Sequence, residues 1–499
     1  MRTLRIAALI VLGPIATLEA QQAAAILSRP QLADLDTWIE KARKEWELPG
    51  IAVAIVQGDS VVLAKGYGVR ELGKSDSVNE HTLFGIGSNA KTMTAALAAM
   101  MVDEGKLRSD DPIYRYLPAF RVADPYVSQN ATVRDALSHR TGVRGPLAFY
   151  YGAPLTTPQI VERMRFLDQE TGFRSTFNYS NLMFMVAGEV TAAVAGKSWG
   201  DLLHERIYGP LDMNESVRSG QRLAGRANVA SAHMTRRDGQ LIVIPNIGGE
   251  AMAPAGALFS SARDMAQWLR LQLGNGVYQG KRLISERSMN AMRTVVTATT
   301  FGSGDGRTGF GYGLGWFMGT YRGHRAIWHG GGVDGMTSDL QLLPDDQVGV
   351  VVLTNSSSNS LHRALTQHVF DLVLGLPEKD WNGEALARAA KQRDAETARM
   401  KALEAQRFNA PPPWPLERYA GTYSDSLMGE MTIAVDGDKL IARYHPGYVA
   451  TLVPWSLNTF RLDWRYPSAV NPPFATFSQS PTGGMPDLEV AGVGRFRRR

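Results

Sequence analysis

The feature that most constrains the fold is a charged, alanine-rich stretch from Glu384 to Gln406, because the sequence pattern differs on its two sides. Its residues favour a helix, but the apolar stripe along that helix is thin, and Pro411–Pro413 follow it. We therefore interpret residues 377–413 as a solvated linker helix. A chain of 499 residues exceeds one ordinary domain, so a division into two parts is expected.

Before the linker, helical and extended patterns are mixed along the chain. Apolar residues at helical spacing predict helices over Leu32–Leu48, Lys91–Val102, Leu182–Val194 and Leu361–Leu374. Strands are predicted over Ile51–Val56, Val61–Val69, Ala326–Trp328, Asp339–Leu343 and Val348–Thr354, of which the first two form a hairpin. The last of these helices would cover the sheet, and residues 21–376 are expected to form one large α+β domain.

After Trp414 the pattern changes to short segments of alternating apolar and polar residues. These segments are Met431–Val435, Leu440–Tyr444, Thr459–Trp464 and Phe474–Phe477. They predict a small antiparallel β-module over residues 414–499. The chain contains no cysteine, so neither part depends on disulfides, and thiolate zinc sites and cysteine nucleophiles are excluded.

The first 20 residues have the pattern of a secretory signal peptide. Arg2 and Arg5 precede an apolar run from Ile6 to Leu18, and Ala20 provides a small residue for cleavage. This run is shorter than the ~20 apolar residues that a membrane-spanning helix needs. The alternative is a buried N-terminal helix. No later segment of the sequence is long and apolar enough to cross a membrane, so we expect a periplasmic or secreted protein.

The charges and the histidines argue against several other kinds of function. The net charge of +5 arises from 53 basic and 48 acidic residues that are interspersed, so nucleic acid is not an expected partner. The nine histidines include no His-Glu-x-x-His motif, and no metal is implied. Gly330, Gly332 and Gly335 match a dinucleotide fingerprint but open no helix within a βαβ unit, so no cofactor is expected.

Ser88 and Lys91 form a Ser-x-x-Lys motif where an extended segment enters a predicted helix. The serine oxygen is expected near the positive end of the helix dipole, with the lysine one turn away on the same face. A hydroxyl needs a neighbouring base to act as a nucleophile at neutral pH, and a lysine can be that base if burial lowers its pKa. The structural alternative is a helix N-cap followed by a surface lysine.

Tyr179, Ser180 and Asn181 directly precede the predicted helix that starts at Leu182. A phenol can relay a proton between nucleophile, base and leaving group, and an asparagine amide can orient a substrate carbonyl. The alternative is a loop tyrosine packed on the core, with the asparagine as a helix N-cap.

A third motif, from His329 to Gly332, consists of a histidine and three glycines directly after a predicted strand. An edge strand without side chains lets the backbone approach a substrate closely. The amide of Gly332, together with that of Ser88, could then form an oxyanion hole. The alternative is that the glycines form a turn.

Together and in this order, the three motifs resemble the signature of the penicillin-recognising serine hydrolases, which include serine β-lactamases and penicillin-binding proteins. The resemblance extends over roughly residues 33–374, and four further stretches are similar to the family: Thr132–Gly142, Pro254–Leu269, Tyr312–Trp316 and Leu353–Asn355. It implies a β-lactamase-like α/β sandwich, in which helices flank a mixed antiparallel sheet. The active site would lie between this sheet and a helical subdomain.

The resemblance also implies a role for each motif residue. Ser88 would attack a carbonyl carbon, with Lys91 as the base and Tyr179 as the proton relay. Four residues would position the substrate: Asn181, His329, Gly330 and Gly331. The amides of Ser88 and Gly332 would hold the oxyanion, and water would then hydrolyse the acyl-enzyme.

Two of the motifs indicate which branches of the family this sequence resembles most. The Tyr-x-Asn motif is similar to that of class C β-lactamases, D,D-carboxypeptidases and D-aminopeptidases, rather than class A enzymes. The His-Gly-Gly motif at His329 is similar to the D-aminopeptidase branch and departs from the Lys-Thr-Gly of most β-lactamases. This departure argues against efficient β-lactam hydrolysis, because a permanent cation at that position normally meets the drug's carboxylate. Tyr419–Tyr423 resembles the start of the lipocalin-like module of some of these peptidases.

We therefore expect an exported serine hydrolase that cleaves an amide or peptide bond in substrates with a D-residue or a small residue. A small peptide, amide or ester would be its partner. Three alternatives remain open: a carboxylesterase, a β-lactamase or D,D-carboxypeptidase, and, outside the enzymes, a catalytically weak protein that binds cell-wall fragments. The oligomeric state is not predicted.

Overall fold

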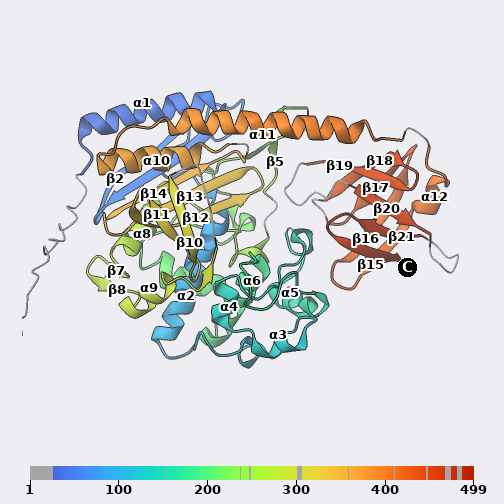
Figure 1. The fold of residues 1–499 in the computed structure, drawn as a ribbon, viewed down its shortest axis with the longest axis horizontal. Helices are drawn as coiled ribbons and strands as arrows, with labels where there is room; N and C mark the ends of the chain where they lie inside the picture. Colours follow the sequence, from blue (N-terminus) through green and yellow to red (C-terminus); the bar gives the residue numbers. More distant parts are fainter. Residues whose placement is uncertain are drawn as a thin grey trace, which may run out of the picture.

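A large α+β part and a small β-barrel form the molecule, and helix α11 (Trp381–Glu404) runs between them (Figure 1). The computed structural model describes residues 26–499, except for residues 152, 237, 247–248, 300–305, 358, 409–410, 446–447, 467–473 and 480–485. The predicted signal peptide, residues 1–20, lies outside the described residues. Within the described part of the chain, no helix is both long and apolar enough to span a membrane.

An eight-stranded antiparallel sheet forms the centre of the α+β part. In spatial order its strands are β2 (Ser60–Gly68), β1 (Gly50–Gln57), β14 (Val348–Thr354), β13 (Met336–Leu343), β12 (His324–Val333), β11 (Phe317–Tyr321), β10 (Arg307–Tyr312) and β9 (Thr297–Ala298). All residues of β1 are buried, because helices cover both faces of the sheet at this strand. This explains why β1 is an unbroken apolar run rather than an alternating one.

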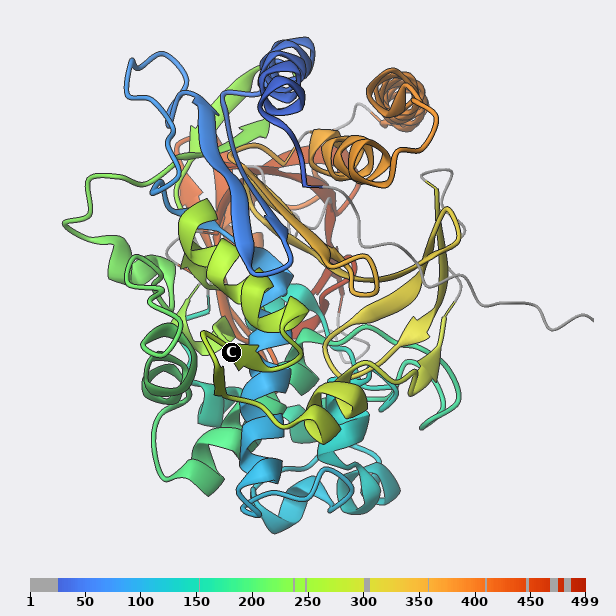
Figure 2. The ribbon, with the colours of Figure 1, turned by 90° about the vertical axis from the view of Figure 1, so that its left-hand side faces the viewer.

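Three helices cover one face of the sheet: α1 (Arg29–Glu45), α10 (Leu361–Leu374) and the first turns of α11. Figure 2 shows them nearly end-on above the strands. Ile39, Val350 and Leu365 belong to the core that these helices share with the sheet. On the opposite face lie α8 (Ala262–Leu273) and α2 (Ala90–Asp103). The predicted sheet flanked by helices is thus confirmed.

The helical subdomain lies beyond α2, on the side away from α10 (Figure 1). Its helices are α3 (Pro125–Asn130), α4 (Val133–Leu137), α5 (Thr157–Arg163), α6 (Asn181–Ala195) and α7 (Trp199–Leu203), with α9 (Glu286–Met292) beside them. Every residue of α2 from Ala90 to Met101 is buried. The many alanines of α2 allow the close packing against α6 and α9 that such burial requires.

Three two-stranded ribbons complete the α+β part, and one of them leads directly into the predicted catalytic motif. They pair β3 (Phe84–Gly85) with β6 (Phe259–Ser260), β4 (Ala232–Thr235) with β5 (Leu241–Ile244), and β7 (Val277–Tyr278) with β8 (Lys281–Arg282). After β3 the chain forms one short turn, η1 (Gly87–Asn89), before α2 begins.

The C-terminal part is a closed antiparallel barrel of eight strands. These are β15 (Gly421–Asp425), β16 (Gly429–Asp436), β17 (Lys439–Arg443), β18 (Val449–Ser456), β19 (Thr459–Trp464), β20 (Phe474–Ser478), β21 (Asp487–Val490) and β22 (Gly494–Arg498), with the short helix α12 (Leu416–Tyr419) before them. Buried residues alternate along β16 and β18, as expected for a barrel with a filled interior. The predicted antiparallel β-module is therefore confirmed as a closed barrel.

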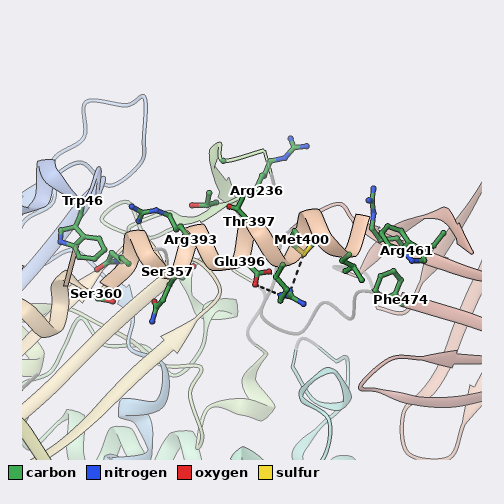
Figure 3. A pocket seen from close by; sticks show the side chains of 18 residues that line it. Trp46, Arg236, Ser357, Ser360, Arg393, Glu396, Thr397, Met400, Arg461 and Phe474 are labelled. Carbon is green, nitrogen blue, oxygen red and sulfur yellow. Dashed lines mark hydrogen bonds and ion pairs between the residues drawn. The ribbon is translucent and has the colours of Figure 1, made fainter. Parts of the chain in front are cut away.

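Polar contacts connect the barrel to α5 of the helical subdomain and to the end of α11. The Arg163 guanidinium on α5 donates a hydrogen bond of 3.4 Å to the Leu427 carbonyl in the turn between β15 and β16. Arg461 of the barrel pairs with Glu404 at the end of α11, at 3.0 Å. A groove of about 930 Å³ runs along α11 between these parts, with Trp46 at one end and Phe474 at the other (Figure 3). None of the predicted site residues lines this groove.

A chain that ends near residue 410 is expected to remain folded, because every described strand of the barrel pairs only with other barrel strands. Its substrate preference should change, since the turn at Leu427 lies against α5 of the helical subdomain. Circular dichroism during heating, compared with the full chain, measures the first expectation, and turnover of a substrate panel measures the second. A shortened chain without a cooperative unfolding transition would place the barrel within the same folding unit as the sheet.

Candidate active site

Ser88 lies in the η1 turn directly before α2, and Lys91 follows one turn later in the first turn of that helix. Gly87 has φ of 51°, and a Cβ at this position would lie 2.4 Å from the Gly332 nitrogen. Only glycine therefore allows η1 to approach β12 this closely. Ser88 is partly exposed, while Lys91 is completely buried.

The Lys91 ammonium group lies among three oxygen atoms. Its Nζ is 2.9 Å from Ser88 Oγ, 2.7 Å from Asn181 Oδ1 and 2.5 Å from the Ala255 carbonyl oxygen. No carboxylate is among these three partners, and burial lowers the pKa of Lys91 well below its ordinary value. An amine in this place has two N–H groups for the two carbonyl oxygens, which leaves its lone pair for the Ser88 hydroxyl.

Tyr179 and Asn181 reach the same place from the start of α6. Ser180 caps α6 through its side chain, which accepts a hydrogen bond from the Met183 amide, so Asn181 is the first residue of the helix. Lys91 Nζ lies 4.9 Å from the centroid of the Tyr179 ring. Burial raises the pKa of the Tyr179 hydroxyl, and a hydrogen bond with Ser88 offsets part of that effect. The phenol is therefore protonated at neutral pH and can donate.

The three glycines of the third motif belong to β12 rather than to a turn. β11 pairs with β12 only as far as Trp328, so one edge of β12 is free of β11 from His329 onward. Over one face of β12 the backbone of Ile86 and Gly87 packs against Gly331 and Gly332. A Cβ on Gly331 would lie 2.0 Å from the Ile86 carbonyl oxygen, which excludes any other residue.

His329 is 1% exposed and lies beside Tyr179, with 6.4 Å between their ring centroids. Its Nδ1 lies 2.7 Å from the Gly330 carbonyl oxygen, and its Nε2 lies 3.0 Å from the Tyr312 hydroxyl. A carbonyl oxygen only accepts, so Nδ1 carries the hydrogen, and Tyr312 donates to Nε2. Burial, together with the nearby Lys91, lowers the pKa of His329 to about 3. The ring is therefore neutral at any ordinary pH.

The structure thus brings all predicted site residues together around the end of β12 and the starts of α2 and α6. A serine hydroxyl, a buried lysine, a protonated phenol and a closely approached glycine backbone meet here, and acyl transfer can use such a set of groups. Among the described residues, no group of three or more histidine, aspartate or glutamate side chains is arranged to hold a metal ion.

Comparison with known proteins agrees with this chemistry. A family model described as Beta-lactamase matches residues 35–374, which is more than half of the chain. The chain belongs to the β-lactamase family. A second model, of a domain of unknown function (DUF3471), matches residues 405–495, which cover barrel strands β15 to β21 and the start of β22 in this β-lactamase-family protein.

Two relatives of this β-lactamase-family chain illustrate the range of the family. An unguisins hydrolase from Aspergillus campestris is 32% identical over 425 residues, which cover 80% of this chain and 77% of that protein. Penicillin-binding protein 4 from Amycolatopsis lactamdurans is 29% identical over 318 residues, which cover 63% of this chain and 82% of that protein. This member of the β-lactamase family is a hydrolytic enzyme, as predicted.

Solved structures agree on the β-lactamase-like fold. The octameric penicillin-binding protein homologue from Pyrococcus abyssi superposes with a TM-score of 0.60 at 22% identity, covering 93% of this chain and 99% of that one. A D-stereospecific amidohydrolase from Streptomyces gives a TM-score of 0.53 at 23% identity, covering 65% of this chain and 94% of that one. At these identities the likeness concerns the fold alone.

Two contacts of the site in this β-lactamase-family chain were not predicted from the sequence. The Ala255 carbonyl oxygen binds Lys91, and the Tyr312 hydroxyl binds His329. Both residues lie in stretches that resemble the family, Pro254–Leu269 and Tyr312–Trp316, and that resemblance is the only sequence signal that points to them. A third residue, Tyr150, accepts a hydrogen bond of 3.2 Å from the Asn181 amide and has no motif of its own.

Proposed function

We propose that this chain is an exported serine hydrolase that cleaves amide or peptide bonds, in substrates with a D-residue or a small residue, through an acyl-enzyme on Ser88. The observation that carries the proposal is the 2.9 Å contact between Nζ of the completely buried Lys91 and Oγ of the partly exposed Ser88. Because burial lowers the pKa of Lys91, its amine form is available at neutral pH to accept the serine proton.

Acylation then follows from the positions of these groups. Lys91 takes the proton from Ser88 while Oγ forms a bond to the carbonyl carbon of the substrate. The carbonyl oxygen becomes an oxyanion, which accepts hydrogen bonds from the amides of Ser88 and Gly332. Tyr179 gives its proton to the leaving amine or alkoxide and regains one from Lys91 as the carbon–nitrogen or carbon–oxygen bond breaks. The lysine is then an amine again.

Deacylation repeats these steps with water. The water gives a proton to Lys91, through Tyr179 or directly, and its oxygen attacks the acyl carbon. The bond between that carbon and Ser88 Oγ breaks, and the serine recovers its proton from Lys91. The product leaves as a carboxylic acid, and the enzyme returns to its starting state.

The surroundings of the predicted substrate site favour uncharged groups. His329 is a neutral ring, and the glycines at 330 and 331 add space rather than charge. The Asn181 side chain is left as the polar group that positions the substrate carbonyl. A substrate with a free carboxylate finds no permanent cation at the His329 position, so amides and esters are favoured over penicillins. Ester hydrolysis is a second candidate activity, which the same neutral histidine favours equally.

The names of the relatives support this choice of chemistry. One relative is an unguisins hydrolase, and a protein of the same fold is a D-stereospecific amidohydrolase. A penicillin-binding protein is also among the relatives, so β-lactam turnover belongs in any test. A panel of matched D- and L-aminoacyl amides, p-nitrophenyl esters and a chromogenic cephalosporin separates these activities. Turnover of none of them would favour the binding-protein alternative.

Replacing His329 with lysine is expected to shift the preference of the enzyme towards substrates that carry a carboxylate. One charge-assisted hydrogen bond to that carboxylate is worth about tenfold in kcat/KM relative to the wild-type enzyme. The measurement is kcat/KM for a D-alanyl amide and for the same compound with a free carboxylate, in both proteins. A wild-type kcat/KM above about 10⁶ M⁻¹s⁻¹ for the cephalosporin lies well within the range of efficient enzymes. It would contradict the proposed preference for amides and show that the enzyme is a β-lactamase.

The pH profile of the wild-type enzyme provides an independent expectation. Activity should fall as the pH falls through the lowered pKa of Lys91, because the ammonium form has no lone pair for the serine proton. His329 should add no ionisation near pH 6.5, since its pKa is lowered to about 3. A profile of kcat/KM with a step near 6.5 that His329→Asn removes would contradict the neutral site.

Export is part of the proposal because of the N-terminal pattern of Arg2, Arg5 and the apolar run from Ile6 to Leu18. Expression of the full chain in a bacterial host, followed by N-terminal sequencing of the periplasmic and secreted fractions, tests it. A mature protein that starts near Gln21 supports cleavage by signal peptidase. A full-length protein that remains in the cytoplasm contradicts it.

A further inference from the structure

His139 is completely buried and lies beside Tyr179. It belongs to the stretch Thr132–Gly142 and comes shortly after the end of α4. Its ring centroid lies 4.2 Å from that of Tyr179 and 4.7 Å from that of Tyr312. Phe177 and Phe184 enclose the ring on its other sides, at 5.4 Å and 5.0 Å between centroids. No step of the proposed reaction uses this histidine.

Two hydrogen bonds connect His139 to the residues on either side of Tyr179. The Asn178 amide donates to the His139 carbonyl oxygen at 2.8 Å. The Ser180 amide donates to His139 Nδ1 at 3.0 Å. One residue therefore holds the backbone amides of both neighbours of the tyrosine, while its ring contacts the tyrosine ring. Loss of the bond to Ser180 would loosen the backbone that carries Tyr179.

The hydrogen bond from Ser180 defines the state of the imidazole. Nδ1 accepts, so it carries no hydrogen, and Nε2 must carry the hydrogen of a neutral ring. Burial lowers the pKa of His139 well below its ordinary value, and the nearby Lys91 and His329 lower it further. Within the described residues, Nε2 has no hydrogen-bond partner. A buried N–H without a partner opposes folding, so an apolar ring would suit stability better than histidine does.

The backbone at His139 is also held in place. Its φ of 57° lies in the left-handed region, which few residues other than glycine and asparagine adopt readily. The next residue, Arg140, binds the buried Asp135 carboxylate at 2.5 Å, and Arg174 binds the same carboxylate at 2.7 Å. Asp135 also closes a capping box with Thr132 at the start of α4. The carboxylate thus fixes the position from which the imidazole reaches Ser180.

We propose that His139 is a positioning residue that holds the Tyr179 hydroxyl in line for proton transfer to the leaving group, through its bonds to Asn178 and Ser180. It does not touch the reacting atoms. The inference rests on the proposed role of Tyr179 as the proton relay. A leaving group that needs a proton, such as an amine, depends on this alignment, whereas p-nitrophenolate leaves without one.

The test compares two substrates with the same acyl group, a D-alanyl amide and a D-alanyl p-nitrophenyl ester. His139→Phe keeps a ring against Tyr179 but removes the acceptor for Ser180. It should lower kcat for the amide at least tenfold, within the range of general acid catalysis, change kcat for the ester less than about threefold, and leave both KM values nearly unchanged. His139→Asn, whose Oδ1 can accept from Ser180 and whose backbone tolerates the left-handed region, should recover part of the amide turnover.

A double-variant cycle separates alignment of the tyrosine from general damage. In a Tyr179→Phe background, which lacks the relayed proton, His139→Phe should lower amide turnover by less than about twofold. His233→Phe is the matched control, because His233 is also fully buried and also accepts a backbone hydrogen bond, from Leu72. It should lower the midpoint of thermal unfolding without changing the ratio of amide to ester turnover.

Three outcomes would overturn the inference: equal losses for amide and ester in His139→Phe, additive losses in the cycle, or the same change of ratio in His233→Phe. If Tyr179→Phe itself shows wild-type amide turnover, the proposed relay fails, and this result is distinct from a failure of His139 alone. Should His139→Phe not fold, the comparison of His139→Asn with His139→Gly replaces it. Asparagine and glycine both adopt the left-handed backbone conformation of residue 139, but only asparagine supplies an acceptor for the Ser180 amide. Equal amide turnover in these two variants would therefore overturn the inference.

Discussion

Replacing Lys91 with arginine should leave a folded protein whose kcat is lowered about 10²–10⁴-fold, the range that loss of a general base produces. Arginine can donate to Asn181 and the Ala255 carbonyl oxygen as the ammonium form of lysine does, but its guanidinium does not deprotonate in a protein and has no lone pair for the serine proton. The wild-type lysine has a lowered pKa because it is buried without a carboxylate partner. The expected loss therefore follows from the missing base.

The Lys91→Arg variant must be shown to be folded, since a larger group enters a position with 0% exposure. A thermal unfolding curve measured beside the wild-type curve supplies this control. Lys65→Arg, at an exposed position on β2, is a substitution of the same chemistry away from the site and should have wild-type turnover. Near-normal kcat in Lys91→Arg would show that Lys91 only supports the structure and that another group takes the serine proton.

Replacing Ser88 with alanine should lower kcat at least roughly a thousandfold, because the reaction then lacks its covalent route. The change removes one oxygen atom from a partly exposed position, so the fold should be preserved. Loss of the hydroxyl also leaves Lys91 Nζ with two oxygen partners instead of three. Any residual rate should come from the oxyanion donors and the binding of substrate.

Ser180→Ala is a useful comparison for Ser88→Ala, because Ser180 is a neighbouring serine whose side chain only caps α6. Loss of such a cap costs about 1 kcal/mol of stability. Its activity should therefore remain far above that of Ser88→Ala at temperatures where both are folded. Comparable activity of Ser88→Ala and the wild-type enzyme, on the amide and the ester alike, would exclude Ser88 as the nucleophile.

The elements with strong periodic patterns could be predicted from the sequence. The apolar spacing over Leu361–Leu374 corresponds to the bounds of α10, and the hairpin over Ile51–Val69 corresponds to β1 and β2 within one residue at each end. The ends of helices differ from the prediction where the backbone conformation of a single residue decides them. α1 ends at Glu45 rather than near Leu48, because Glu47 has φ of 51° and ends the helical backbone.

Strands rich in glycine were not recognisable in the sequence. β10 contains Gly309 and Gly311, and β12 continues through its glycines to Val333, beyond the predicted end at Trp328. Glycine has a low intrinsic preference for strands, so pairing with a neighbouring strand decides the structure there. β12 pairs with β13 along Ile327–Val333, and β13 follows β12 after only two residues.

For the candidate site, the reactive side chains could be predicted from the sequence, but the contacts that only the fold creates could not. Side chains whose chemistry is unusual in their context, such as Ser88, Lys91 and Tyr179, could be selected from the sequence and from the family resemblance. The Ala255 carbonyl oxygen could not, because every residue has one and only the fold places this one beside Lys91. His329 could be selected from the family resemblance, but its bond to Tyr312 depends on two strands that are not adjacent in the sequence.

The central claim of this account is that Ser88 carries the acyl group. Incubation of the full chain with a serine-reactive phosphonate, followed by intact-mass measurement and peptide mapping, tests it directly. The account predicts one equivalent of label, located on the peptide that contains Ser88, together with loss of activity in proportion to labelling. Ser88→Ala should remain unlabelled. Label on any other residue, with Ser88→Ala still labelled and still active, would contradict the account.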